Sequence, residues 1–160
     1  MSIQVGERVP EVTLKRIREG VETVDTTTLF DGRKAVLFAV PGAFTPTCSA
    51  KHMPGYVAKM DEFRKRGIEV ACLSVNDAFV MDAWAKSQDV PAGVHMLADG
   101  NGAFTQALGL ELDATAFGMG LRAKRFALYA EDGGVKQLHV EAPGEFKVSA
   151  ADYVLEHLPA

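Results

Sequence analysis

The chain has 160 residues, of which 48% are hydrophobic and 24% are charged. These proportions are ordinary for a globular protein and exclude a disordered chain or a collagen-like repeat. Seventeen Lys and Arg residues against 21 Asp and Glu residues leave a formal net charge of −4. Because proteins that bind nucleic-acid backbones are usually basic, we expect no nucleic-acid partner. The length predicts one domain over residues 1–160.

No apolar run approaches the ~20 residues that a membrane-spanning helix needs, so we expect no membrane association. The first eight residues lack the basic and apolar regions of a secretory signal peptide, and we therefore predict a cytoplasmic protein. The two cysteines, Cys48 and Cys72, are too few for a disulfide scaffold. Each of them is therefore a candidate either for chemistry or for packing.

The strand patterns begin with two short runs, 12–15 and 21–24, which flank a charged turn at Gly20 and predict an N-terminal β-hairpin. Continuous apolar runs predict strands that are buried on both faces of a sheet. These runs cover 34–40, 69–75 and 125–130, with a shorter strand at 95–97. A tight turn at 131–134 leads into a run at 135–140, so we expect the last two strands to form a hairpin.

Helical patterns lie between the predicted strands. The first places apolar residues from Tyr56 to Phe63 on one face and ends with cations before Gly67. The second is capped by Asn76 or Asp77. Its predicted buried stripe consists of Phe79, Val80, Ala83 and Trp84.

Two shorter helices complete the pattern. Asn101 opens one that ends at Leu108 before Gly109, and Ser149 caps the last one. The last helix is predicted to bury Tyr153, Val154 and Leu158. Strands that alternate with helices predict βαβ units and a partly parallel sheet, completed by the antiparallel hairpin. The expected fold class is therefore α/β, with a thioredoxin-like central mixed sheet flanked by helices.

The segment that follows the first core strand carries the most information about function. The strand ends at Pro41-Gly42, and a helix begins either at Thr45, with Pro46 in its first turn, or at Thr47. In both cases Cys48 lies in the first helical turn, where backbone N–H groups lack partners and favour a thiolate. Because sites in parallel α/β sheets form at the carboxyl ends of strands, we interpret Cys48 as a nucleophile.

The stretch from Pro41 to Ser49, with His52 and Pro54-Gly55 after it, closely resembles the active site of the atypical, or type II, peroxiredoxins. This branch includes the type-five enzymes, and the resemblance is to the form without a fused glutaredoxin domain. The resemblance continues through 71–80, 97–99 and 124–126. It implies a thiol-dependent peroxidase that reduces hydrogen peroxide and small alkyl hydroperoxides in antioxidant defence and redox homeostasis.

By this resemblance Cys48 is the peroxidatic cysteine, and Thr45 hydrogen-bonds to its sulfur and to the peroxide. Arg125 lies beside the thiolate, and Pro41 shields the pocket. Without the resemblance, Arg122 would be as good a candidate as Arg125. An arginine is always charged and offers fixed donors to a sulfur anion and to both peroxide oxygens. A threonine hydroxyl accepts one hydrogen bond while it donates another, which helps to hold the peroxide in line.

His52 follows Cys48 by four residues, which leaves a Cys–His hydrolase as an alternative. Pro54 removes an amide donor nearby and is expected to kink or break the helix. The family does not use this histidine as a base. We therefore expect His52, together with Gly42, to support the site from behind.

Cys72 lies in the middle of a predicted buried strand, which is typical of an inert thiol, with a resolving cysteine as the alternative. Some relatives carry their resolving cysteine in a loop that corresponds to 142–147 here, and this segment has no cysteine. We therefore expect a one-cysteine mechanism in which glutathione or a glutaredoxin reduces Cys48, with thioredoxin as an alternative reductant. A peroxide sensor or chaperone that passes oxidation to a partner is the non-enzymatic alternative.

The resemblance also implies a homodimer, in which Phe44, Phe79 and Phe117 form an apolar contact near the active-site loops. We expect no metal and no cofactor. The four histidines lack metal-ligand spacing, and the segment 99–102 fails as a calcium loop because Leu110 stands where a Glu is needed.

Overall fold

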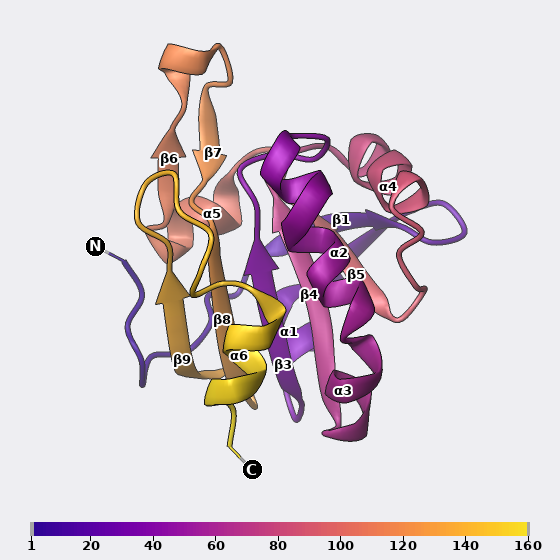
Figure 1. The fold of residues 1–160 in the computed structure, drawn as a ribbon, viewed down its shortest axis with the longest axis vertical. Coiled ribbons are helices and arrows are strands. Elements are labelled where there is room, and N and C mark those ends of the chain that lie inside the picture. The colour runs from indigo at the N-terminus through magenta and orange to yellow at the C-terminus, as the bar shows by residue number, and fades with distance from the viewer. Residues whose placement is uncertain (1, 160) are drawn as a thin grey trace.

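A seven-stranded mixed sheet forms the centre of the molecule in the computed structural model, which describes residues 2–159 (Figure 1). The strand order is β2-β1-β5-β4-β3-β8-β9. The strands are β1 (Thr13–Ile17), β2 (Val21–Asp25), β3 (Lys34–Ala39), β4 (Ile68–Ser74), β5 (Val94–Ala98), β8 (Phe126–Glu131) and β9 (Gly134–Val140). The β3–β4 and β4–β5 pairs are parallel, and the other pairs are antiparallel.

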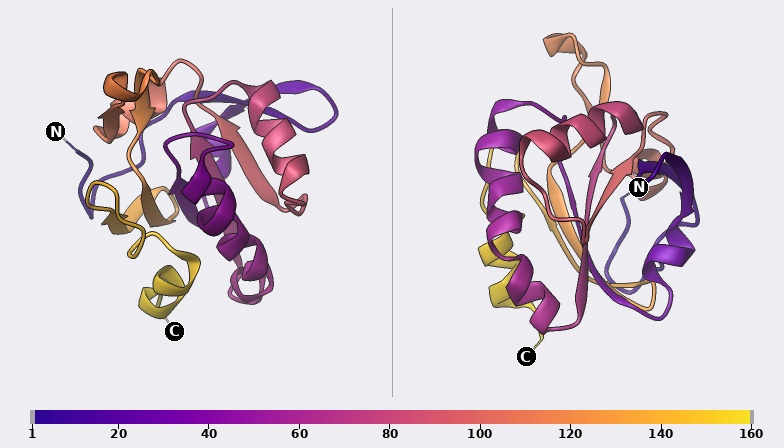
Figure 2. Two further views of the ribbon diagram at one scale, coloured as in Figure 1. Left: turned by 45° about the horizontal axis from the view of Figure 1, so that its top comes forward. Right: turned by 90° about the vertical axis from the view of Figure 1, so that its right-hand side faces the viewer.

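Helices cover both faces of this sheet (Figure 2). One face carries α2 (Met53–Ala58), α3 (Met60–Lys65), α4 (Ala78–Ser87) and α6 (Ala151–His157). The other face carries α1 (Thr26–Phe30) and α5 (Ala103–Leu108). Successive side chains of a strand point to opposite faces, so Phe38 joins the first cluster and Leu37 the second. Burial on both faces explains the continuous apolar runs and confirms the predicted fold class.

A second, two-stranded sheet was not predicted. It consists of β6 (Glu111–Asp113) and β7 (Leu121–Ala123), with the 3₁₀ turn η2 (Thr115–Phe117) at its tip. This hairpin projects from the upper end of the molecule in Figure 1. Strands of three residues are too short to show a hydrophobic periodicity in the sequence. The five-residue helix α1 was not predicted for the same reason.

The predicted buried stripe of α4 is confirmed at Trp84 and wrong at Phe79, Val80 and Ala83. The side chains of α4 that are buried are those of Ala78, Met81 and Trp84, whereas Phe79 is 69% exposed. The helix begins at Ala78 because the Asp77 carboxylate caps it, accepting from the Val80 N–H over 2.8 Å. With this start, positions three residues apart face the sheet, and Phe79 points away from the core.

The predictions for two other helix starts are wrong. The helix α5 begins at Ala103, after Gly102, and not at Asn101, and the Asp99 carboxylate accepts from the N–H groups of Phe104 and Thr105 over 3.1 and 2.8 Å. Ser149 does not cap α6, since its hydroxyl donates to the Glu141 carboxylate instead, over 2.6 Å. Both differences arise from a carboxylate whose position the local sequence pattern did not reveal. Over residues 2–159, none of the helices combines the length and the apolar character that crossing a membrane requires.

Candidate active site

The candidate active site lies where β3 ends and the helical segment with Cys48 begins. A loop, 41–45, leads from the strand to helical backbone that starts at Pro46. Residues Cys48–His52 form a π-helical turn, η1, in which the Met53 N–H donates to the Cys48 carbonyl. Such turns are rare and occur frequently at functional sites. Cys48 is fully buried in the core cluster on this face of the sheet.

Arg125 reaches Cys48 because of the register between β3 and β8. Ala39, the last residue of β3, pairs with Phe126, the first residue of β8. Arg125 therefore lies beside the strand end that leads to Cys48, and its Nη2 donates to Cys48 Sγ over 3.1 Å. A guanidinium keeps its charge and donates from a rigid plane, so this contact stabilises a sulfur anion.

Arg122 has different partners. Its Nη1 donates to the Val75 carbonyl over 3.1 Å, and its Nε donates to the Met119 carbonyl over 2.9 Å. The bond to Val75 ties the β6–β7 hairpin to the end of β4, and the bond to Met119 lies within the hairpin. Of the two arginines that the sequence left equal, Arg125 is the one that contacts Cys48.

His52 contacts Arg125, and each of its two ring nitrogens has a hydrogen-bond partner. Its Nδ1 is 2.7 Å from Arg125 Nη1, and its Nε2 is 3.1 Å from the Ser149 carbonyl oxygen. A guanidinium only donates, so Nδ1 must accept and the proton must lie on Nε2. Burial and the Arg125 charge lower the pKa of His52 to about 3. A neutral imidazole with both nitrogens occupied supports Arg125 and has no free lone pair for a hydrolase mechanism.

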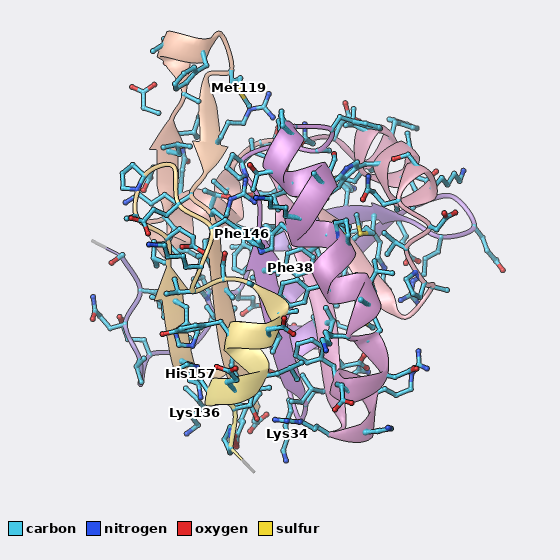
Figure 3. The ribbon with its side chains drawn as sticks, in the orientation of Figure 1. Lys34, Phe38, Met119, Lys136, Phe146 and His157 are labelled. Carbon is cyan, nitrogen blue, oxygen red and sulfur yellow. The ribbon has the colours of Figure 1, made fainter. Side chains whose placement is uncertain are left out.

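Aromatic rings surround this histidine. The ring centroids of Phe38, on β3, and Phe146, in the segment before α6, each lie 5.0 Å from that of His52 (Figure 3). Phe38 also stacks on Tyr56 at a centroid distance of 3.9 Å. The rings exclude water from the rear of the site, which strengthens the hydrogen bonds within it.

The structure differs from the expected role of Thr45. Its hydroxyl donates to the Gly42 carbonyl over 2.7 Å, and none of the hydrogen bonds among the described residues joins it to Cys48. A hydroxyl has one proton, so only its lone pairs stay available, and these can accept the O–H of a peroxide. A Cβ at Gly42 would lie 3.2 Å from Thr45 Cγ2. The absence of a side chain at Gly42 therefore leaves room for the Thr45 side chain in its observed position.

The active-site loop is fixed by a residue that sequence reasoning considered only as a helix cap. Asn76 Oδ1 accepts from the Ala43 N–H over 3.0 Å and from the Ser74 hydroxyl over 2.5 Å. These bonds pin the loop to the end of β4. Next to Ala43, Phe44 adopts a left-handed conformation with φ of 64°, which is unusual for a residue other than glycine. Pro41, at the start of the loop, is half-buried.

The helix does not break at Pro54. Helical backbone runs from Pro46 through Ala58, and the irregularity lies before the proline, in the π-helical turn. A wider turn accommodates the missing amide donor without ending the helix. The helix ends instead at Lys59, so the single helix predicted up to Gly67 is two, α2 and α3.

Cys72 lies in the middle of β4, paired with Phe38 on one side and Met96 on the other. It is fully buried and belongs to the same core cluster as Cys48. Burial raises the pKa of Cys72 well above its usual value, and the neighbouring Cys48 raises it further. Both cysteines are free thiols in this structure.

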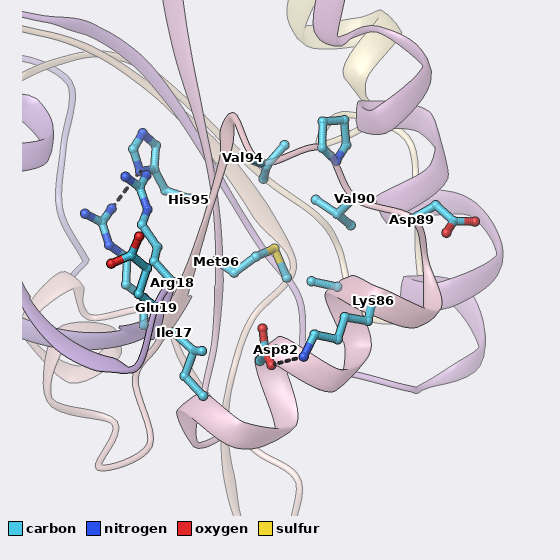
Figure 4. Close-up of a pocket in the computed structure, with 14 residues that line it drawn as sticks. Ile17, Arg18, Glu19, Asp82, Lys86, Asp89, Val90, Val94, His95 and Met96 are labelled. Carbon is cyan, nitrogen blue, oxygen red and sulfur yellow. Dashed lines mark hydrogen bonds and ion pairs between the residues drawn. The ribbon is translucent and has the colours of Figure 1, made fainter.

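A cavity of about 630 Å³ lies elsewhere, between the β1–β2 turn, the end of α4 and the start of β5 (Figure 4). The side chains that line it do not include those of the Cys48 site. Two pairs of polar side chains in its lining contact each other: Lys86 and Asp82 over 2.9 Å, and Arg16 Nη1 and His95 Nδ1 over 2.8 Å. Within residues 2–159, no three His, Cys, Asp or Glu side chains form a group that could hold a metal ion.

Comparison with known proteins places this arrangement in a family. Residues 4–155 match the Redoxin family. The chain is 50% identical to Peroxiredoxin-2E, chloroplastic, of Arabidopsis thaliana, covering 98% of this chain and 70% of that protein. Reduced Prx3 of Vibrio vulnificus, solved in complex with hydrogen peroxide, superposes with a TM-score of 0.91 at 47% identity, covering 96% of this chain and 98% of that one. The Plasmodium falciparum antioxidant protein, a 1-Cys peroxiredoxin, gives a TM-score of 0.88 at 29% identity, with coverage of 96% and 97%.

A buried cysteine near the start of a helix, bonded by an arginine beside a thioredoxin-like sheet, is an arrangement typical of thiol-dependent oxidoreductases. The chain belongs to the Redoxin family and, within it, to the type-five peroxiredoxins. This confirms the resemblance drawn from the motif around Cys48. As a peroxiredoxin, the chain is a peroxidase that acts through a thiol.

Proposed function

We propose that this peroxiredoxin reduces hydrogen peroxide and small alkyl hydroperoxides with Cys48 as its only redox-active cysteine, and that glutathione or a glutaredoxin restores the thiol. The observation that carries the proposal is the 3.1 Å contact between Arg125 Nη2 and Cys48 Sγ. We also propose that Arg125 stabilises the thiolate, that Thr45 accepts the peroxide O–H and that Pro41 shields the pocket. His52 supports Arg125, and Gly42 leaves room for Thr45.

The reaction follows from these contacts. The Cys48 thiolate attacks the proton-bearing oxygen of the peroxide; a sulfur–oxygen bond forms and the oxygen–oxygen bond breaks. Thr45 accepts the O–H of the bound peroxide, and the Arg125 N–H groups that bond neither Cys48 nor His52 stabilise the departing oxygen. That oxygen takes up a proton and leaves as water or an alcohol. Cys48, oxidised by two electrons, is left as sulfenic acid.

Two thiols then return the two electrons. The first glutathione attacks the sulfenic sulfur and releases water, which leaves a mixed disulfide on Cys48. A second thiol, from glutathione or from a glutaredoxin, attacks the glutathione sulfur, forms a new disulfide and releases the Cys48 thiolate. Thioredoxin is the alternative reductant for these steps.

The internal alternative, Cys72, is a poor resolving cysteine. It is buried in the centre of β4 as an un-ionised thiol, whereas attack on a sulfenic acid needs a thiolate. Residues 142–147, where some relatives carry a resolving cysteine, contain none. The name of the Plasmodium falciparum relative, a 1-Cys peroxiredoxin, supports the same mechanism.

We also propose a homodimer. Phe44, Phe79 and Phe117 are 54, 69 and 82% exposed, and the loop, helix and hairpin that carry them lie at the upper end of the molecule in Figure 1. Burial of three such rings favours association. In sedimentation of the reduced protein we expect a dimer at micromolar concentration, and a Phe79→Ser/Phe117→Ser variant should be a monomer. A monomeric wild type would contradict this assignment. The cytoplasmic location and the single-domain organisation of residues 1–160 stay predictions.

The experiment that tests the function is peroxide consumption by the purified protein with glutathione, with and without glutaredoxin. We expect catalytic turnover in wild type and in Cys72→Ser, and none in Cys48→Ser. A single stoichiometric oxidation of Cys48, without turnover in any thiol, would instead favour the peroxide sensor. Dependence on thioredoxin alone would overturn the choice of reductant.

A further inference from the structure

The segment between β9 and α6 lies against the rear of the active site, and three of its residues make specific contacts there. Glu141, Phe146 and Ser149 are called the C-terminal clamp here. Figure 3 shows Phe146 over the centre of the molecule, close to Phe38. The Arg125 guanidinium carbon lies 5.9 Å from the centroid of the Phe146 ring. The clamp thus comes from a part of the chain that follows the whole sheet, and it contacts the residues that hold Cys48.

Ser149 contacts the site through its carbonyl oxygen. This oxygen accepts from His52 Nε2 over 3.1 Å and from the Tyr56 hydroxyl over 2.7 Å. The first of these bonds fixes the proton of His52 on Nε2 and the plane of its ring. The other ring nitrogen then faces Arg125 Nη1, 2.7 Å away. The position of one backbone carbonyl therefore decides where the imidazole presents its lone pair.

Glu141 holds that carbonyl in place. Its Oε2 accepts from the Lys147 N–H over 2.7 Å, the Ser149 N–H over 2.8 Å and the Ser149 hydroxyl over 2.6 Å. Its own N–H donates to the Arg125 carbonyl over 3.0 Å. Glu141 is 9% exposed, and burial alone would raise its pKa, but the hydrogen bonds from Ser149 and Lys147 outweigh this and lower it. The buried, ionised Glu141 carboxylate thus holds Lys147 and Ser149 of the same segment in place.

These contacts form one continuous series from Glu141 through Ser149, His52 and Arg125 to Cys48. Each member has its partner within hydrogen-bond distance, and the series is shielded by Phe38 and Phe146. An arginine side chain has many accessible rotamers, so its direction has to be fixed by its neighbours. If any hydrogen bond in this series is lost, Arg125 Nη2 is free to move away from Cys48 Sγ.

We propose that Glu141 is a positioning residue for the peroxidase reaction. It holds the C-terminal clamp so that Ser149 fixes His52 and His52 directs Arg125 at the Cys48 sulfur. Glu141 touches neither the sulfur nor the peroxide. The inference rests on the proposed function of Cys48 as the peroxidatic cysteine.

The test compares Glu141→Ala and Glu141→Gln with Glu145→Ala as a matched control. Glu145 lies in the same segment but is exposed, and its carboxylate pairs only with Lys147 among the described side chains. Trp84 is the only tryptophan, and its Nε1 donates to Ser49 Oγ, next to Cys48. Its fluorescence in rapid mixing with hydrogen peroxide therefore follows the oxidation of Cys48, and ultraviolet absorbance measures the thiolate before mixing.

In Glu141→Ala we expect the oxidation rate to fall by about tenfold to hundredfold, the cost of a displaced catalytic group, with a smaller thiolate absorbance at pH 7. Glutamine keeps one acceptor oxygen, so Glu141→Gln should recover part of the rate. Glu145→Ala should stay within about twofold of wild type, as is usual for a surface change. Wild-type rates and thiolate absorbance in Glu141→Ala would overturn the proposal.

A double-mutant cycle separates positioning from a general structural effect. If Glu141 acts through Arg125, Glu141→Ala should change the rate by less than about twofold once Arg125 is already alanine. An undiminished effect in the Arg125→Ala background would overturn the proposal. If Glu141→Ala fails to fold, Glu141→Gln and Ser149→Ala take its place. Each should lower the rate by about threefold or more through lost hydrogen bonds, and wild-type rates in both would overturn it.

The proposed function has a separate readout. An inactive wild type, or activity that survives in Cys48→Ser, would overturn the function itself and with it the positioning role. A wild type that is active through Cys48, combined with an unaffected Glu141→Ala, would remove only the role of Glu141.

Discussion

The two cysteines of this chain are equally buried but lie in different surroundings. Cys48 and Cys72 belong to the same core cluster on one face of the sheet. Cys48 lies where a strand gives way to a helix and accepts a hydrogen bond from Arg125. Cys72 lies mid-strand between Phe38 and Met96, and its burial raises its pKa. The comparison teaches that two equally buried thiols differ in whether a cationic donor lies within reach of the sulfur, and on the proposed function this difference separates the reactive cysteine from the inert one.

Removal of that donor should have the largest effect. We expect Arg125→Ala to slow the reaction of Cys48 with peroxide by about 10²–10³-fold, as for the loss of a donor that stabilises transition-state charge. Arg122→Ala is the matched control, since it loses only carbonyl contacts at the hairpin and should cost less than about tenfold. Rapid-mixing kinetics with hydrogen peroxide measure both rates. Equal losses in the two variants would mean that the wrong arginine has been assigned.

The second prediction concerns His52, which contacts the arginine that Cys48 has and Cys72 lacks. The pKa of His52 is about 3 in the folded protein, against 6.5 when the side chain is exposed. Between these values the unfolded state binds one more proton than the folded state, so the stability due to His52 is lost as pH falls from 6.5 toward 3. The slope is about 1.4 kcal/mol per pH unit.

Urea unfolding at a series of pH values tests this prediction against His52→Asn, which cannot titrate. We expect the free energy of unfolding to change with pH more steeply in wild type than in the variant. The difference in slope should correspond to about one bound proton. Other acid-sensitive groups, including Glu141, are common to both proteins and cancel in the difference. Equal slopes would contradict a neutral His52 in the folded state.

A third prediction addresses Cys72 as a packed residue. Cys72→Ser places a hydroxyl in the middle of a buried strand, and we expect it to lower the free energy of unfolding by about 1–3 kcal/mol. Turnover with peroxide and glutathione should stay close to wild type at temperatures where the variant is folded. Cys72→Ala, which adds no polar group, serves as the comparison for turnover. Loss of turnover in both folded variants would give Cys72 a chemical role.

The last of these predictions concerns the loop that holds Thr45. In Gly42→Ala the new Cβ would lie 3.2 Å from Thr45 Cγ2 and 3.4 Å from Met119 Cε. The methionine is flexible and can move, whereas displacement of Thr45 changes the acceptor for the peroxide O–H. We expect a loss of about tenfold in the rate at low peroxide concentration, with less change in thiolate absorbance. An unaltered rate would show that Thr45 tolerates the shift.

The sequence revealed those parts of the fold and site that depend on local pattern. Apolar runs predicted β3 and β4 because both faces of these strands are buried. The Pro- and Thr-rich loop after β3 indicated a helix start, and this local pattern placed Cys48 in the first helical turn. Asp77 was recognisable as a cap, but the side of α4 that carries Phe79 was not, because the stripe depends on where the helix starts.

Contacts between distant segments were not accessible to such reasoning. Arg125 lies 77 positions from Cys48, and only the β3–β8 register shows why it, and not Arg122, reaches the sulfur. Glu141 and Ser149 looked like parts of an ordinary loop and helix start. Their involvement follows from tertiary hydrogen bonds. Nor did the sequence show that the hydroxyl proton of Thr45 goes to Gly42.

The central claim, that Cys48 acts without Cys72, is tested most directly by mass spectrometry after one equivalent of hydrogen peroxide. Wild type and Cys72→Ser are treated with and without glutathione, and the modified peptides are mapped. We predict sulfenic or sulfinic acid on Cys48 without glutathione, a glutathione adduct on Cys48 with it, and the same pattern in both proteins. A stoichiometric disulfide between Cys48 and Cys72 in wild type would contradict the account and define a two-cysteine mechanism.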